Sequence, residues 1–215
     1  MFVLFLAAAG FGFAVRQPNQ TQNEDGRTVQ QKIECFDGAG GQGLSQVFAD
    51  AITDLGKYSF DEKISSCCVT GTWILYTDAD FNTGNQGAAM YWTYGDNTCL
   101  DIPDDFNNQA SSLRFAGSRA DWCFPSINIY SGPYFSGESN WYFKDTSNLG
   151  SIPAQSLIVN SGSAWTIYEG ENYQGRAVCV YPKEGGNCLP EVYFDYFVIG
   201  SIRRGCSEEV IKDHY

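Results

Sequence analysis

The alternation of apolar and polar residues along the chain predicts short, half-buried strands rather than long helices. Its clearest example is Trp165-Thr-Ile-Tyr168, which alternates over one strand length. The polar residues at 169–172 then predict a turn, and a second aromatic residue and a glycine follow at Tyr173 and Gly175. Extended runs that bear aromatic residues and lead into Gly-rich bends begin near Lys32, Trp73, Ile127 and Trp165.

The pattern is duplicated along the chain. Trp73, Tyr76 and Phe81 are repeated, at a nearly constant separation, by Trp165, Tyr168 and Tyr173. Self-similarity of this kind predicts two similar domains, which we place at 31–118 and 119–208. Each half divides again into two units of three or four short strands. The predicted fold class is all-β, with paired antiparallel sandwiches.

The two ends of the chain differ from the repeated part. Residues 1–15 carry no charge and have the length of a signal-peptide core, which is short for a membrane span. An N-terminal core strand is the alternative. Residues 16–30 are polar, predict a flexible tail and include an N-glycosylation sequence at Asn19, and residues 209–215 form a C-terminal tail. We therefore expect a secreted protein, extracellular in location, with no membrane span.

The formal net charge of −12 limits the classes of partner. An acidic surface repels the phosphates of nucleic acids and anionic membranes. It attracts cations and basic partners. The alternative is that the charge only keeps the protein soluble.

The eight cysteines predict disulfide bonds in an oxidising compartment. Zinc is the competing interpretation, but the chain has no Cys-x-x-Cys pair and a single histidine. Cys67 and Cys68 are adjacent and therefore point to opposite faces of a strand, so we expect them to have different partners. We also expect a local bridge between Cys179 and Cys188 across a turn at 182–187. The rest of the connectivity does not follow from the sequence.

The repeated units resemble the Greek-key motif of the βγ-crystallin family, which has an aromatic residue, four residues, a second aromatic residue, one residue and glycine. The first unit has Gly41 where the second aromatic residue stands, and the second unit has Thr83 at the glycine position. Each unit also ends in a strand that bears serine. The resemblance spans about 32–206 and implies two sandwich domains of two Greek keys each. The complete motifs consist of Tyr130, Phe135 and Gly137, and of Tyr168, Tyr173 and Gly175.

Some members of that family bind calcium through a stretch of two Asn or Asp residues, two variable residues, Ser or Thr, and Ser. Residues 107–112 match every position, and residues 61–66 match all but the second, which is Glu62. The family shares ligands between the two motifs of one domain, so the resemblance implies calcium binding in the first domain. The implied ligands are the side chains of Asp61, Ser65, Asn107 and Ser111 and the carbonyl groups of Lys63 and Gln109, with further carbonyls from the turns at 37–40 and 78–80.

Calcium prefers six to eight oxygen ligands, and those implied here carry little formal charge, so we expect moderate affinity. Turn formation is the alternative role for Asn107, Asn108 and Asp61, because Asn and Asp often bond their own backbone. The equivalent stretches 151–156 and 196–201 begin without an acid or amide. We therefore expect no calcium in the second domain.

Catalysis is not expected. A nucleophilic Ser or Cys usually needs a base such as histidine, and the single histidine, His214, is next to last in the chain. Asp101, Asp104 and Asp105 flank Pro103, a pattern that favours a solvated acidic loop over a pair of catalytic carboxylates. The sequence thus predicts a non-enzymatic protein.

Two functions remain in competition. The first is a structural or calcium-binding extracellular protein. The alternative is a defence or toxin-like protein, or an inhibitor, that contacts an extracellular protein partner through its loops. The segment 91–94, Tyr-Trp-Thr-Tyr, is the candidate for an exposed aromatic loop, with an ordinary strand as its alternative. A cytosolic lens-type role is disfavoured by the cysteines and the expected signal peptide. The sequence does not predict the oligomeric state.

Overall fold

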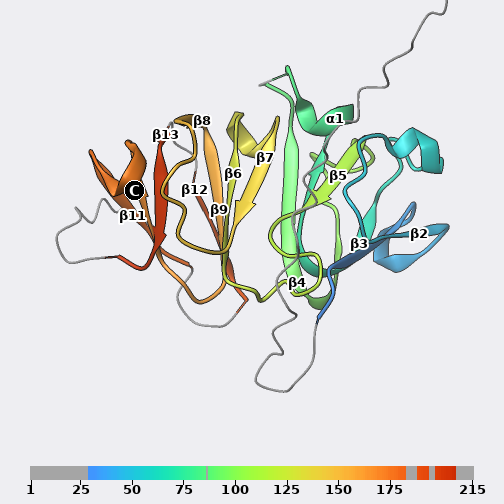
Figure 1. Cartoon of the computed structure of the whole chain (residues 1–215). Coiled ribbons are helices and arrows are strands. Elements are labelled where there is room, and N and C mark those ends of the chain that lie inside the picture. The colour runs from blue at the N-terminus through green and yellow to red at the C-terminus, as the bar shows by residue number, and fades with distance from the viewer. Residues whose placement is uncertain (1–28, 86, 183–187, 194–196, 207–215) are drawn as a thin grey trace, which may run out of the picture.

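A computed structural model describes residues 29–85, 87–182, 188–193 and 197–206. Within these ranges the chain forms antiparallel strands joined by turns and by helical segments of three or four residues. Figure 1 shows two β-rich halves side by side, with β7 of the second half next to β4 of the first. The all-β Greek-key prediction is confirmed.

Among the described residues, no helix is long and apolar enough to cross a membrane.

Several expectations from the sequence concern parts of the chain outside the described residues. They are the signal peptide at 1–15, most of the tail at 16–30 with Asn19, and the C-terminal tail at 209–215 with His214.

The first half is built on one sheet in the order β2-β1-β3-β4, with β5 also paired to β3. The first part of β3 pairs with β1 and its last part pairs with β5, so this strand connects the two units of the first half. The register shifts between Val69 and Gly71, where the backbone of Gly71 has φ +105°. The elements are β1 (Lys32–Phe36), η1 (Ala39–Gly41), β2 (Ser45–Phe48), η2 (Leu55–Tyr58), β3 (Ser66–Tyr76), α1 (Ala79–Asn82), β4 (Met90–Asp101) and β5 (Ser112–Phe115).

The second half divides its strands among three sheets, in the orders β12-β9-β6-β7, β11-β10-β14 and β13-β8. The elements are β6 (Ser126–Tyr130), η3 (Pro133–Phe135), β7 (Ser139–Tyr142), β8 (Ile152–Ala154), β9 (Ser156–Asn160), β10 (Trp165–Tyr168), η4 (Glu171–Tyr173), β11 (Ala177–Val180), β12 (Pro190–Tyr193), β13 (Phe197–Ile199) and β14 (Ser201–Arg204).

A serine at the start of a later strand holds the folded hairpin of every unit, and we call this arrangement the serine clasp. Its hydroxyl accepts a hydrogen bond from a backbone N–H of the hairpin and donates one to a carbonyl at the hairpin's start. The clasps are Ser66 with Gly41 N (2.9 Å) and Gly38 O (2.6 Å), Ser112 with Phe81 N (3.1 Å) and Asp78 O (2.6 Å), Ser156 with Phe135 N (2.9 Å) and Gly132 O (2.7 Å), and Ser201 with Tyr173 N (2.9 Å) and Gly170 O (2.6 Å).

The aromatic residues of the motifs pack over these hairpins, as the sequence predicts. The ring centroids lie 5.7 Å apart for Tyr76 and Phe81 and 5.3 Å apart for Tyr130 and Phe135. The fourth unit repeats the contact. In the first unit a single ring, that of Phe36, lies over Gly41. The first hairpin therefore has half of the aromatic cover that the other three have.

Each half has its own hydrophobic core, and a third cluster lies between them. The first core gathers residues such as Trp73 and Leu113, and the second gathers residues such as Trp165 and Ile202. The third cluster takes Ile74 and Tyr76 from the first half and packs them against the second. The second-half members of this cluster are Tyr130, Phe135 and Ile158.

Arg114 is the polar centre of the contact between the halves. It is only 4% exposed, and its guanidinium lies 4.6 Å from the ring centre of Phe81 and 4.8 Å from that of Tyr130. It donates to the hydroxyl of Tyr76 and to the carbonyls of Gly137 and Phe135. Within the described residues no carboxylate pairs with it. Aromatic faces of both halves and backbone oxygens of the second half thus stabilise this buried charge.

The expected bridge between Cys179 and Cys188 is wrong. Cys179 is bonded to Cys206, and Cys188 is bonded to Cys123. The strands explain the difference, because β10 pairs with both β11, which carries Cys179, and β14, which Cys206 follows. The neighbours Cys67 and Cys68 do differ in environment, since Cys68 is bonded to Cys99 and Cys67 is a buried thiol.

We predict that Ser156→Ala destabilises the protein by about 1–3 kcal/mol, because it leaves the buried N–H of Phe135 and carbonyl of Gly132 without their partner. Urea unfolding followed by tryptophan fluorescence measures the change. Ser147→Ala, at an exposed serine of the same half, is the control and should change stability little. Equal effects of the two substitutions would contradict the role of the clasp.

We predict that Arg114→Met costs at least about 2 kcal/mol and separates the unfolding of the two halves, because buried carbonyls lose their donor. Differential scanning calorimetry distinguishes one transition from two. Arg203 is the matched control. It occupies the equivalent place in the fourth unit, 4.3 Å from the ring centre of Tyr173, but half of its side chain is exposed. Arg203→Met should therefore change stability by less than about 1 kcal/mol, and a single, unshifted transition for Arg114→Met would contradict the prediction.

Candidate metal site

The structure brings the two stretches 61–66 and 107–112 together as a symmetric pair. The N–H of Glu62 donates to the carbonyl of Ala110 at 3.0 Å, and the N–H of Asn108 donates to the carbonyl of Ile64 at 3.0 Å. Glu62 and Asn108 hold the same position in their stretches, and both have a left-handed backbone, with φ +51° and +57°. Because the stretches bond to each other, their polar side chains share one region of the first half.

Each stretch is also attached to the hairpin strand of its own unit. The N–H of Ser65 donates to the carbonyl of Phe36 at 2.9 Å, and the N–H of Ser111 donates to the carbonyl of Tyr76 at 2.7 Å. Phe36 and Tyr76 are the first aromatic residues of their motifs. The position of both stretches is therefore fixed by the same strands that the serine clasps hold.

Asn107 carries the most informative atom of the site. Its Oδ1 is buried, and nothing in the described part of the chain donates a hydrogen bond to it. Leaving a buried amide oxygen without a partner costs about 1–3 kcal/mol. Turn formation was the alternative role for Asn107, but an oxygen with no donor does not stabilise a turn. An unpartnered oxygen of this kind is suited to a cation.

Ser65 and Asn108 satisfy each other. The hydroxyl of Ser65, which is 8% exposed, donates to Oδ1 of Asn108 at 2.9 Å across the two stretches. Ser65 was predicted as a ligand and Asn108 was not. The family's pattern could have indicated Asn108, because Asn108 occupies the second Asn or Asp position of the complete stretch.

Three of the other predicted ligands lie on the surface. Lys63 and Gln109 are exposed, and their side chains donate to the carbonyls of Ser59 (2.9 Å) and Asp105 (2.8 Å). Asp61 is exposed. Among the described residues, no hydrogen bond or ion pair joins its carboxylate to another predicted ligand. The structure thus brings the two stretches together, but among the described residues the carboxylate of Asp61 bonds to none of the other predicted ligands.

Asp101 also lies near this region, and it was not predicted as a ligand. It stands opposite Ser66 in the β3–β4 register, and its Oδ1 accepts from Gly40 N at 2.6 Å. Together with Gly41 these residues line a depression of about 210 Å³ beside the first hairpin. The strand register that places Asp101 there was not apparent from the sequence.

The donor set favours a hard cation. Within the described residues, no three side chains of His, Cys, Asp or Glu are grouped so as to hold a metal ion. The available ligands are amide, hydroxyl and carbonyl oxygens, which suit calcium better than the transition metals that prefer imidazole or thiolate.

The other candidate features have structural roles. Residues 91–94 lie inside strand β4, and Trp92 is half-buried against the cluster between the halves. Its ring stacks on that of Tyr94 at 5.7 Å. The segment is therefore a strand and not an exposed loop. Asp104 and Asp105 are exposed in the turn after Pro103, as expected of a solvated acidic loop.

Comparison with known proteins shows similarity to βγ-crystallin domains. The family model described as "Beta/Gamma crystallin" matches residues 126–204. The human "Beta/gamma crystallin domain-containing protein 1" is 27% identical over 144 residues, which is 64% of this chain and 6% of that protein. The chain therefore spans only a small part of that relative's length.

A solved structure supports the same fold. Geodin, a beta-gamma crystallin from Geodia cydonium, is 19% identical, covers 81% of this chain and 99% of its own, and superposes with a TM-score of 0.63. Protein S complexed with calcium covers 81% of this chain at 15% identity, with a TM-score of 0.33. At that TM-score the likeness supports no conclusion about calcium in this chain.

Proposed function

We propose that this chain, whose residues 126–204 match the βγ-crystallin family model, is a secreted, non-enzymatic structural or binding protein of that family whose first half binds calcium. The two domains of this proposal are residues 31–118 and 119–208. Their separate hydrophobic cores support the division. Three disulfide bonds among the described residues support maturation in an oxidising compartment.

The unpartnered Oδ1 of Asn107 carries the calcium proposal. A bound cation would satisfy this oxygen. The carboxylate of Asp61, the hydroxyls of Ser65 and Ser111, and the carbonyls of Lys63 and Gln109 would complete the ligand set. Ser65 donates its hydroxyl proton to Asn108, which leaves the lone pairs of the Ser65 oxygen free for calcium.

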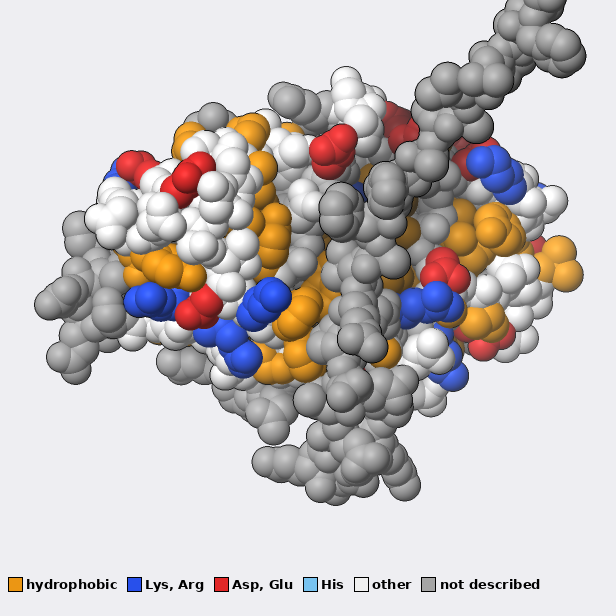
Figure 2. Space-filling model, in the orientation of Figure 1, with side chains coloured by type: hydrophobic (Ala, Val, Ile, Leu, Met, Phe, Trp, Pro, Cys, Tyr) orange, Lys and Arg blue, Asp and Glu red, His pale blue; other side chains and the backbone are white. Residues whose placement is uncertain are grey.

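Calcium would supply positive charge to oxygens that belong to both units of the first half. A ligand that binds only the folded form stabilises it by RT ln(1 + [L]/Kd), which is about 2.7 kcal/mol at one hundred times Kd. The acidic net charge of −12 raises the local cation concentration at the surface. On the face drawn in Figure 2, acidic side chains lie at separate places over both halves, so this attraction is general rather than directed to one point.

We predict that millimolar calcium raises the thermal unfolding midpoint of the full chain and that Asn107→Ala abolishes or strongly weakens this shift. Without calcium, Asn107→Ala should leave the midpoint unchanged or raise it, because the substitution removes a buried acceptor that has no donor. Isothermal calorimetry measures the binding and scanning calorimetry measures the midpoint.

Asn140→Ala, at an exposed asparagine of the second half, is the matched control and should keep the full calcium response. Loss of stability in calcium-free Asn107→Ala would favour the turn-forming role of this residue. Wild-type protein that shows neither heat nor a midpoint shift with calcium would refute the site.

A further inference from the structure

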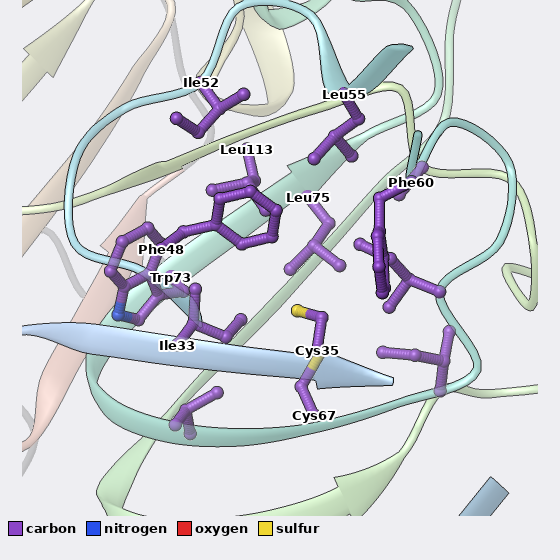
Figure 3. Close-up of a cluster of buried hydrophobic side chains, with 14 of the residues drawn as sticks. Ile33, Cys35, Phe48, Ile52, Leu55, Phe60, Cys67, Trp73, Leu75 and Leu113 are labelled. Carbon is purple, nitrogen blue, oxygen red and sulfur yellow. The ribbon is translucent and has the colours of Figure 1, made fainter. Parts of the chain in front are cut away.

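Cys35 and Cys67 face each other in the core of the first half. They are directly opposed in the register of β1 and β3, and their exposed fractions are 0% and 1%. In the structure both are buried thiols. Figure 3 shows the two side chains together at the centre of the hydrophobic cluster.

The other three units place two large aliphatic side chains at the same positions. Each position is the residue before the first aromatic of the motif, and its partner is the residue after the clasp serine. The first unit alone has two cysteines there. The aliphatic pairs, each opposed in its strand register and buried, are Leu75 with Leu113, Ile129 with Leu157, and Ile167 with Ile202.

We propose that Cys35 and Cys67 form a disulfide bond that links β1 to β3 and takes the place of this aliphatic pair. Directly opposed residues of antiparallel strands have Cα atoms about 4.5 or 5.5 Å apart. Both distances lie within the range of roughly 4.4–6.8 Å that disulfides span. The bond therefore forms without movement of the backbone.

Formation of this bond requires an oxidant, and we use oxidised glutathione as that oxidant. The thiolate of one cysteine attacks the donor and forms a mixed disulfide, releasing one glutathione thiolate. The thiolate of the second cysteine attacks the protein sulfur of that bond and releases the second glutathione. Two electrons pass from the two protein thiols to the donor, and the two thiol protons end on the two glutathione molecules.

The bond forms while the chain folds rather than afterwards. Both sulfurs are closed off by the finished core, and burial raises the pKa of Cys35, which disfavours the reactive thiolate. A donor reaches the pair only while β1 and β3 are apart. Once made, the bond is protected from reductants by the same burial.

The position of the bond gives it a local role. Cys35 precedes Phe36 and Cys67 follows Ser66, so the link lies beneath the first serine clasp. This is the hairpin that has Gly41 in place of the second aromatic residue. A covalent link between β1 and β3 would offset the missing aromatic contact.

The test counts thiols in the full chain. Protein refolded from the reduced state with oxidised and reduced glutathione is denatured, alkylated with iodoacetamide and weighed by mass spectrometry. The proposal predicts four disulfides among the eight cysteines and no alkylation. Two alkyl groups, located at Cys35 and Cys67, would overturn it.

Variants resolve the assignment, because a protease cannot readily separate the neighbours Cys67 and Cys68. In Cys68→Ser/Cys99→Ser the first half retains only Cys35 and Cys67, and alkylation should still be absent. Two alkyl groups in this variant would show that the pair does not bond and would overturn the proposal. Cys35→Leu/Cys67→Leu, which copies the Leu75–Leu113 pair, is the folded control and should lack the cross-link between β1 and β3.

Discussion

A serine hydroxyl that both accepts and donates holds each folded hairpin against a later strand of the same unit. The hairpins need this support, because each places at least two consecutive residues in the left-handed backbone region. For residues other than glycine that conformation costs roughly 1–2 kcal/mol per residue. Tyr134 and Phe135 adopt it in the third unit, and the hydroxyl of Ser156 bonds the N–H of Phe135 directly. The clasp thus lets aromatic residues, rather than only glycines, occupy the turn and cover the core.

The same clasp makes the fold independent of the proposed calcium site. The residues just before each clasp serine are held in place by the strand register, whatever their side chains are. In the first half these residues include Asn107 and Asn108, and an oxygen is left without a donor. In the second half the equivalent stretch begins at Ser151 and still delivers the clasp serine Ser156. The proposed calcium ligands would therefore be an addition to a unit that folds without them.

The sequence predicted what is local and repeated, namely the aromatic positions, the bends and the serine strands. It did not predict contacts made between distant elements. The bond from Cys123 to Cys188 spans 65 residues and depends on how the sheets are arranged. Arg114 looked like any polar residue of a strand, and only the docking of the halves buries it. Likewise the resemblance implied that the two stretches share ligands, but it did not indicate that Ser65 would bond to Asn108.

Native-state hydrogen exchange by NMR tests the role of the clasp most directly. The backbone N–H groups of Gly41, Phe81, Phe135 and Tyr173 lie in turns, and their bonds to serine hydroxyls are made outside any strand ladder. If the clasps hold the hairpins, these four amides exchange as slowly as those of the core strands. Exchange at the rates of exposed loops would contradict the account, because the hairpins would then open without breaking the sheets that follow them.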